Sequence, residues 1–438
     1  MNELERLAAA CVFPSFPGTA VPDWASRFLA EGGGGIVLFA YNVSSREELA
    51  GLCSRLRAER DDVLLAVDEE GGDVTRLEWD TGSSYPSAAG LGAIDDVVVT
   101  EAVAASIAGE LASVGVNWNF APVADVNVPA NPVIGARAFG DDAELVARHV
   151  AASVRGTQSR GVAACAKHFP GHGSTHQDSH LELPALVGEL ASGLPPFRAA
   201  IDAGVQSIMT AHIRVAALPA TVDRAIVGEL LRGELGYDGV VIADALEMKG
   251  LSAMYAPGEG AVRAVLAGCD ALIVGHDLHE EAVAEVRTAL AARVPEERLR
   301  EAAGRVARLM AWARPEVGAV DRGAGAAAAR RALRVDGDVS LNGSQRIVEL
   351  RPVANIAAGE FEHALGEIVR EGEPVPAADV YVVRDAHRHA WMREAVDVDG
   401  AVVVETGLPV WRPSRARGYV ATYGGGRASL DAARERLA

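Results

Sequence analysis

Between residues 12 and 313, short runs of apolar and β-branched residues alternate with longer segments of helical periodicity. Eight of these runs predict β-strands, at residues 12–16, 35–39, 64–68, 116–123, 163–169, 207–212, 239–244 and 271–276. The segments between them predict helices, for example at residues 46–59, 99–115, 142–161 and 224–236. Continuous apolar runs are typical of strands buried on both faces, as in parallel sheets. The alternation therefore predicts an α/β fold, a (β/α)8 barrel of the TIM type.

Polar residues stand at or just beyond the ends of several predicted strands. They are Asp68, Asp125, His168, His212, Asp244 and His276. In a barrel of parallel strands, the carboxyl ends of the strands meet at one face and carry the active site. Asp and His are also common in ordinary turns, but six such positions in register favour a functional site.

A second α/β pattern follows the barrel. Helices are predicted at residues 279–294 and 297–313, and residues 318–332 form a Gly-, Ala- and Arg-rich stretch that suits either a linker or a helix. Further strands are predicted at residues 346–350, 380–384, 401–405 and 419–423, with helices near 361–371 and 386–395. We expect a barrel over residues 1–317, a linker over 318–340 and a smaller C-terminal α/β domain over 341–438.

Composition and charge exclude several classes of partner. The 438 residues include 41 basic and 60 acidic side chains, a net charge of −19, which argues against nucleic acids and anionic membranes. No apolar segment reaches the roughly 18 residues that a transmembrane helix needs. Glu3 and Glu5 stand where a signal peptide needs positive charge, so a cytoplasmic protein is expected. The four cysteines form no CxxC pair, which predicts buried, reduced thiols.

Lysine is rare in this chain. Of the 41 basic residues only Lys167 and Lys249 are lysines, and all the others are arginines. Where arginine is used so freely, a retained lysine suggests that a compact ammonium group is needed at that position.

The segment KHFPGHGSTHQDSH (residues 167–180) is the richest in chemistry. It contains His168, His172, His176 and His180, four of the eleven histidines of the chain. Their spacing on a helix would suggest zinc, but Pro170, Gly171 and Gly173 disfavour a helix and there is no HExxH motif. A loop with Asp178 two residues before His180 suits acid–base chemistry better, because the carboxylate can orient the imidazole and stabilise its protonated form. A solvated polar loop is the alternative.

Three other segments carry candidate residues. Asp244 ends the apolar run in VVIADALEM, where a carboxylate can act as nucleophile, metal ligand or substrate clamp. In DEEGGDVTR, Gly71 and Gly72 allow a sharp turn that leaves Asp68 facing the pocket. The loop NPVIGARAFG presents Arg137, for which a surface ion pair is the alternative. Neither phosphate-binding glycine pattern, GxGxxG or GxxxxGK, is present.

With DEEGG upstream and IADALEM downstream, the KHFPGHG…DSH segment resembles glycoside hydrolase family 3, specifically its β-N-acetylglucosaminidase branch. The resemblance covers about residues 10–315, and the second domain is more loosely similar to the α/β sandwich of some members. It implies that Asp244 is the nucleophile that forms a glycosyl-enzyme and that His180 is the general acid/base, with Asp178 as its partner. It further implies that the terminal sugar is held by Asp68, Arg76, Arg137, Lys167 and His168. No metal and no other cofactor is expected.

The resemblance implies a retaining exo-β-N-acetylglucosaminidase. Its substrate would be a small carbohydrate with a terminal β-linked GlcNAc, either a cell-wall (peptidoglycan) fragment or a chitooligosaccharide. A glycoside phosphorylase with the same residues stays open, because a histidine base repels an anionic acceptor less than a carboxylate does. A metal-dependent barrel hydrolase and a non-catalytic sugar-binding protein are further alternatives.

The segments depart from the family pattern at three positions. Asp73 stands where many members have arginine, Ser174 replaces an aspartate, and Ala138 replaces a serine. These differences bear on substrate preference and loop conformation rather than on the class of reaction.

Overall fold

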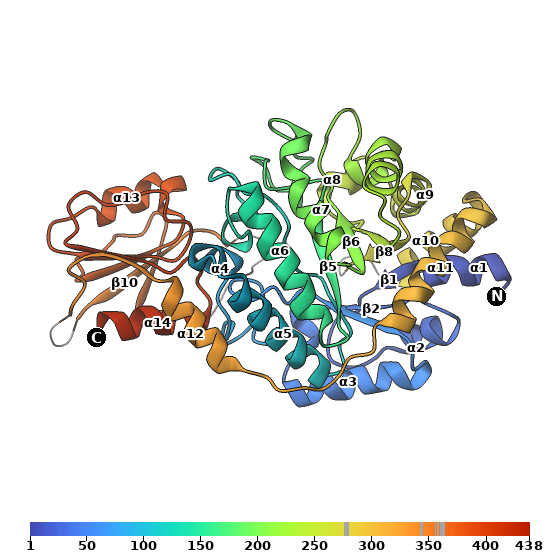
Figure 1. Ribbon diagram of the computed structural model, residues 1–438, viewed down its shortest axis with the longest axis horizontal. Coiled ribbons are helices and arrows are strands. Elements are labelled where there is room, and N and C mark those ends of the chain that lie inside the picture. The colour runs from blue at the N-terminus through green and yellow to red at the C-terminus, as the bar shows by residue number, and fades with distance from the viewer. Residues whose placement is uncertain (276–279, 342–344, 355, 357–358, 360–363) are drawn as a thin grey trace.

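The computed structural model describes residues 1–275, 280–341, 345–354, 356, 359 and 364–438. Its larger part is a parallel eight-stranded barrel surrounded by helices (Figure 1). The strands are β1 (Val12–Pro14), β2 (Gly35–Leu38), β3 (Leu64–Val67), β4 (Trp118–Asn119), β5 (Ala163–Phe169), β6 (Ser207–Thr210), β7 (Val240–Ala243) and β8 (Ala271–Val274). Hydrogen-bonded ladders run in order from β2 to β8 and on to β1, and β1 lies against β2. The barrel is therefore nearly closed, and the predicted fold class is confirmed.

Helices precede, connect and follow the strands of the barrel. They are α1 (Glu3–Ala10), α2 (Asp23–Ala30), α3 (Arg46–Glu59), α4 (Ala88–Ile94), α5 (Val97–Ser113), α6 (Ala143–Gln158), α7 (Pro195–Asp202), a π-type helix (Ala225–Glu234), α8 (Lys249–Ser252), α9 (Pro257–Ala267), α10 (Glu280–Arg293) and α11 (Glu296–Trp312). Local chemistry fixes several starts. The Ser45 side chain caps α3 by accepting from the Glu48 amide, and Asp142 caps α6 in the same way through Leu145. None of the helices in the described part of the chain is long and apolar enough to cross a membrane.

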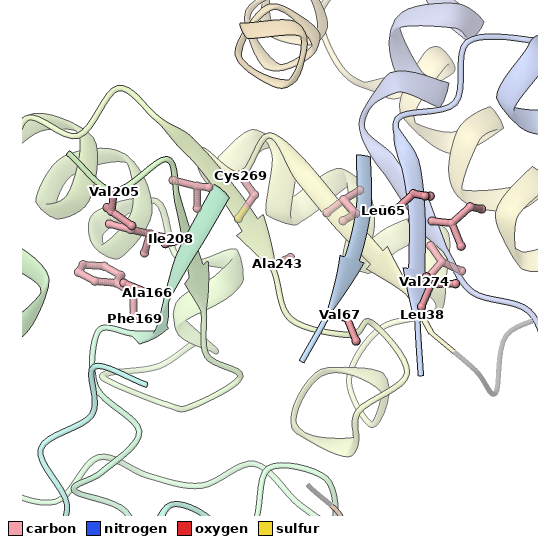
Figure 2. Close-up of a cluster of buried hydrophobic side chains, with 14 of the residues drawn as sticks. Leu38, Leu65, Val67, Ala166, Phe169, Val205, Ile208, Ala243, Cys269 and Val274 are labelled. Atoms are coloured by element: carbon pink, nitrogen blue, oxygen red, sulfur yellow. The ribbon is translucent and has the colours of Figure 1, made fainter. Parts of the chain in front are cut away.

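The strands bury both faces, which explains their apolar sequences. Alternate residues such as Phe13, Trp118 and Ile242 belong to one core cluster, which also contains residues of α11. Their neighbours along the strands belong to the core shared with the surrounding helices, where Figure 2 shows Leu38, Leu65 and other strand residues. This alternation follows from the two-residue period of a strand.

The fourth strand is shorter than predicted. The sequence predicts a strand over residues 116–123, but ladder pairing is limited to Trp118–Asn119, with a single further bridge from Val123 to Lys167. Pro122 lacks an amide hydrogen and cannot donate to a ladder, which interrupts the regular strand. The apolar run is buried as expected even where the ladder is broken.

The C-terminal sheet is a second open α/β layer. Its strands are β9 (Arg334–Gly337), β10 (Ile347–Arg351), β11 (Glu367–Arg370), β12 (Val380–Val383), β13 (Val402–Glu405) and β14 (Gly418–Ala421), in the order β11-β10-β12-β13-β14-β9. All neighbours are parallel except β9, which is antiparallel to β14. Helix α13 (Ala390–Val396) packs in the core cluster on one face, and α14 (Arg427–Leu437) packs in the cluster on the other.

Two interpretations of this region need correction. The helix predicted near residues 361–371 is wrong at its end, because residues 367–370 form strand β11 paired with β10. The sequence there, Glu-Ile-Val-Arg, contains two β-branched residues that favour a strand. Residues 361–363 lie outside the described residues. The segment 318–340, expected as a linker, contains helix α12 (Arg322–Ala332) and strand β9.

The two sheets are joined by contacts that start from the loop after β3. The Asp73 carboxylate is almost fully buried and accepts from Arg384 Nη2 at 2.7 Å and from the Gly425 amide at 2.7 Å. Arg427 of α14 donates to Glu78 Oε1 at 2.7 Å. Helix α12 packs against α4, α5 and α14, between the two domains in Figure 1. The C-terminal domain is therefore tied to the same loop that begins with Asp68.

Candidate active site

The carboxyl ends of the strands surround a cavity of about 790 Å³. Of the eight residues to which the family resemblance assigns a role, seven line it: Asp68, Arg76, Arg137, Lys167, His168, His180 and Asp244. The eighth, Asp178, lines a neighbouring cleft. The cavity lies where strands of a barrel place polar side chains, because Asp68 follows β3, Lys167 and His168 belong to β5, and Asp244 follows β7.

Two carboxylates and two cations form a network of ion pairs on one side of the cavity. Lys167 Nζ lies 2.6 Å from Asp68 Oδ1 and 2.7 Å from Glu70 Oε1. Arg137 forms a bidentate pair with Glu70, at 2.8 Å through Nη2 and 2.9 Å through Nε. The Lys167 side chain is only 2% exposed, so each buried charge here has an opposite charge in contact. We call Asp68, Glu70, Arg137 and Lys167 the ion-paired wall.

Burial and charge compete in this wall. Burial raises the pKa of Asp68, but the charges of Lys167 and Arg76 outweigh it and hold the pKa below its usual value. The pKa of Glu70 is lowered in the same way by Arg137 and Lys167, against burial. Burial lowers the pKa of Lys167, yet Asp68 and Glu70 raise it above normal. All four groups are therefore charged at neutral pH and present fixed donors and acceptors to a ligand.

Arg76 lies beside the ion-paired wall, at the end of the loop that follows β3. Its Nη2 lies 3.7 Å from Asp68 Oδ2, and its side chain is 13% exposed. The loop between Asp68 and Arg76 turns at Gly71 and Gly72, which have φ of 84° and 58°. A Cβ on Gly72 would lie 2.5 Å from the Cα of Ser87, so this position requires glycine for space as well as for conformation.

His168 is held from behind by a buried carboxylate. Its Nδ1 donates to Asp125 Oδ2 at 2.8 Å, and the His172 amide donates to Asp125 Oδ1 at 2.6 Å. Burial raises the pKa of Asp125, but His168 outweighs it and keeps the pKa low, so Asp125 is an anion that fixes the orientation of the imidazole. His212, also at a strand end, is fully buried between Thr221 and the Ala245 carbonyl. His276 lies outside the described residues.

Asp178 and His180 stand on the loop that follows β5. His180 Nδ1 donates to Asp178 Oδ1 at 2.7 Å, and the His180 amide donates to the same oxygen at 2.8 Å. The two side chains are 11% and 23% exposed, respectively. Burial raises the pKa of Asp178, but the contacts with His180 lower it below its usual value. An ionised carboxylate on Nδ1 leaves Nε2 of His180 to exchange a proton with a ligand in the cavity.

Neutral hydrogen bonds hold this loop in place. His172 Nε2 contacts Ser179 Oγ at 2.9 Å and its Nδ1 contacts Thr175 Oγ1 at 2.9 Å. Burial lowers the pKa of His172 to about 4, so this imidazole is neutral at pH 7. The Asn131 side chain donates to the His172 carbonyl at 2.8 Å. Gly173 is required for space, since a Cβ there would lie 2.1 Å from the Val126 carbonyl oxygen.

Three of the four histidines of this segment, His168, His172 and His180, thus have separate hydrogen-bond partners. In the described part of the chain, no group of three or more His, Cys, Asp or Glu side chains is placed to hold a metal ion. His168 is bonded to Asp125, His172 to two hydroxyls, and His180 to Asp178.

Asp244 lies beyond the end of β7 and is partly exposed to the cavity. Its Oδ1 accepts from the Ala245 amide at 2.8 Å, which fixes one carboxylate oxygen. His212 donates through Nε2 to the Ala245 carbonyl at 3.0 Å and so supports the turn. Lys249, at the start of α8, also lines the cavity and is exposed.

Sequence reasoning missed the role of Glu70 and left Asp125 without a function. Glu70 forms ion pairs with both cations of the ion-paired wall, Arg137 and Lys167. The neighbouring Glu69 side chain instead accepts hydrogen bonds within the loop, from the amides of Arg76 and Leu77 at 2.8 and 3.0 Å. The signal was the Asp-Glu-Glu run itself, in which alternate residues of an extended segment face the same side. Asp68 and Glu70 share that side.

A family model described as the glycosyl hydrolase family 3 N-terminal domain matches residues 23–309. The chain is similar to a beta-hexosaminidase of Bordetella avium, with 39% identity over 255 residues, covering 55% of this chain and 73% of that protein. It is also similar to beta-hexosaminidase A of Pseudoalteromonas piscicida, with 37% identity over 268 residues. That match covers 54% of this chain and spans 45% of the relative's length.

A solved structure extends the similarity to both domains. It is the glycoside hydrolase family 3 beta-N-acetylglucosaminidase from Paenibacillus sp. FPU-7, with a TM-score of 0.87 and 29% identity. The similarity covers 100% of this chain and 97% of that chain. The arrangement of barrel and C-terminal sheet is therefore shared with that enzyme.

Proposed function

The chain belongs to glycosyl hydrolase family 3, and from this we propose that it is a retaining exo-β-N-acetylglucosaminidase. Its substrates are small carbohydrates with a terminal β-linked GlcNAc, either peptidoglycan fragments or chitooligosaccharides. The observation that carries the proposal is one cavity lined by Asp244, by His180 and by the ion-paired wall. The names of the relatives and of the Paenibacillus structure support the choice of sugar.

In this mechanism the ion-paired wall binds the terminal sugar. Hydroxyl groups both donate and accept, so a surface of fixed carboxylates and cations matches several of them at once. Lys167, Arg76 and Arg137 donate to sugar oxygens, and Asp68 accepts from a hydroxyl. His168, whose Nδ1 donates to Asp125, adds an acceptor through Nε2. Because these side chains are already held by one another, little ordering is needed when the sugar binds.

Asp244 attacks the anomeric carbon while His180 protonates the departing oxygen. The bond from the anomeric carbon to the leaving oxygen breaks, and a bond to the Asp244 carboxylate forms, giving a covalent glycosyl-enzyme. His180, now neutral, takes a proton from water, which attacks the same carbon and releases Asp244. Asp178 stabilises the protonated imidazole and keeps Nε2 directed to the cavity. Two inversions give overall retention of the β configuration.

Buried thiols support action in a reducing compartment such as the cytoplasm. Cys11, Cys53, Cys165 and Cys269 are all buried and unpaired with one another. Burial raises the pKa of each thiol to about 12, so these cysteines are unreactive core residues. Such cysteines are usual where no disulfides form.

The test is hydrolysis of 4-nitrophenyl β-N-acetylglucosaminide by the full chain and by Asp244→Asn. We expect nitrophenol release by the wild type and a loss of about 10⁴-fold or more in the variant, since the nucleophile is removed. Asp202→Asn, an exposed carboxylate at the end of α7, is the matched control and keeps full activity.

Two results would change the proposal. No release by a correctly folded wild type would contradict the assignment of the sugar. Formation of GlcNAc-1-phosphate instead of GlcNAc in phosphate buffer would assign a phosphorylase with the same nucleophile.

A further inference from the structure

A second cleft, of about 390 Å³, lies between the barrel and the C-terminal domain. One wall is the loop after β5, through Asp178, Leu181 and Glu182. The other wall is the end of the C-terminal sheet, through Val383, Asp385 and Arg388. Neither the ion-paired wall nor Asp244 contributes to it, and Gly359 is the one described residue that lines both the cleft and the cavity.

The cleft lies where an open α/β sheet binds ligands. Strand β10 is flanked by β11 on one side and β12 on the other, so the chain reverses direction across the sheet at β10. At such a reversal the connections leave in opposite directions, and a crevice opens at the carboxyl ends of the two strands. Residues at the ends of β10 and β12, including Arg351 and Val383, line the cleft.

The acid/base pair stands between the two spaces. His180 lines the cavity and Asp178 lines the cleft, joined by their 2.7 Å hydrogen bond. In the proposed mechanism His180 protonates the oxygen of the leaving group, so that group departs on the side of the cavity where His180 stands. The cleft adjoins the cavity near this pair, because Gly359 lines both spaces.

The lining matches a neutral carbohydrate. It carries four arginines and four carboxylates, so it has no net preference for an ion. Arg384 is neutralised by Asp73 and Arg351 by Glu349. Arg388 and Glu182 are exposed, and neither side chain forms an ion pair with another residue in the described part of the chain. They supply a donor and an acceptor from opposite walls, while Leu181, 66% exposed, offers an apolar surface to a sugar ring.

We propose that this inter-domain cleft binds the leaving-group sugars of an oligosaccharide, beyond the ring that is cleaved. Arg388 donates to ring hydroxyls and Glu182 accepts from them across the cleft. The C-terminal domain thereby gives the enzyme a preference for longer chains. The inference rests on the proposed function, since it takes His180 as the group that faces the leaving oxygen.

The test compares chitotetraose with 4-nitrophenyl β-N-acetylglucosaminide, whose leaving group holds no sugar. Arg388→Ala should lower kcat/KM for chitotetraose about 10-fold more than for the aryl glycoside, the loss expected for one hydrogen bond from a charged group. Glu182→Ala should likewise lower kcat/KM for chitotetraose more than for the aryl glycoside. Arg436→Ala, an exposed arginine on α14 of the same domain, is the control and changes neither value.

Equal kcat/KM changes for both substrates, or no change in either, would overturn the proposal. If the wild type turned over neither substrate, the proposed function would be contradicted. Chitotetraose binding measured by titration calorimetry would then test separately whether the cleft binds sugars. Binding that is weakened about 10-fold by Arg388→Ala would support it. Binding that is absent, or unaffected by the substitution, would contradict it.

Discussion

The ion-paired wall and the acid/base loop (residues 170–182) hold polar groups in different ways. In the wall, Lys167 and Arg137 lie between Asp68 and Glu70, with every charge paired and side-chain exposures of 2% to 19%. In the loop, no strand or helix fixes His180, whose side chain is 23% exposed. The loop is held by hydrogen bonds of Asn131 and His172.

The difference matches what each region has to do. Groups that bind sugar hydroxyls act best when they are fixed before the ligand arrives, and charge pairing on strand ends fixes them. A group that gives and takes back a proton has to reach the leaving oxygen and then water, which suits a partly exposed position on a loop. Removing a charge should therefore damage folding in the wall and damage turnover in the loop.

The largest effect is expected from Lys167→Met. The substitution leaves two buried carboxylates with less compensating charge, so the free energy of unfolding should fall by about 3–5 kcal/mol and activity should be lost. Urea denaturation measures the free energy of unfolding, and nitrophenol release measures the activity. Lys249→Met removes an exposed lysine from the same cavity and should change the free energy of unfolding by less than about 0.5 kcal/mol. Equal stability of the two variants would show that the wall is not an ion-paired unit.

Replacing the acid/base residue His180 should lower turnover while leaving the stability of the fold nearly unchanged. His180→Ala should lower kcat/KM for chitobiose by about 10²- to 10⁴-fold, because its leaving group needs protonation. Stability should change little, since the side chain is partly exposed and lies on a loop. Steady-state kinetics and thermal unfolding of the same preparation test both statements. A variant that lost stability instead of turnover would remove the distinction between wall and loop.

The loop should also respond to acid through His172. The folded protein holds this imidazole neutral down to about pH 4, whereas the unfolded chain binds a proton below about pH 6.5. The unfolded state then carries more protons, so the free energy of unfolding should fall as pH falls through this window, by about 3 kcal/mol at most. His172→Gln cannot titrate and should flatten that part of the curve, whatever its stability at pH 7. An unchanged slope would show that His172 is charged in the folded protein.

The smallest effect is expected at the contact between the domains. Asp73→Asn removes the charge that faces Arg384 and should lower the free energy of unfolding by about 1.5–3 kcal/mol. Because Asp73 shares its loop with Asp68 and Glu70, KM should rise more than kcat falls. A change in stability with unaltered KM would confine the role of Asp73 to domain attachment.

The sequence predicted best where burial decides the structure. Strand β5 has the predicted limits because seven consecutive residues are buried, and the eight-strand pattern follows from similar apolar runs. Asp178 and His180 were expected to face each other because a spacing of two residues allows it locally. Helix α3 also matches its prediction, since Ser45 supplies a side-chain cap.

Contacts between distant segments could not be predicted in the same way. Glu70 meets Arg137 and Lys167 only after three strand ends converge, and nothing local distinguishes it from Glu69. Asp73, which differs from the arginine of many family members, is explained by its hydrogen bond from Arg384. Arg384 is more than three hundred residues away in sequence, so the sequence alone could not show this contact. The cleft behind Asp178 depends on how the two domains pack, which neither domain's own pattern specifies.

Trapping the glycosyl-enzyme would identify the nucleophile and so test the proposed mechanism. The full chain is incubated with a fluorinated GlcNAc donor that forms the intermediate quickly and releases it slowly, digested, and mapped by mass spectrometry. We predict a single added mass of the fluorinated N-acetylhexosamine residue on the Asp244 carboxylate. With an unfluorinated substrate, we predict a β-configured first product by nuclear magnetic resonance. A label on another residue, or an α-configured first product from an active enzyme, would contradict the account.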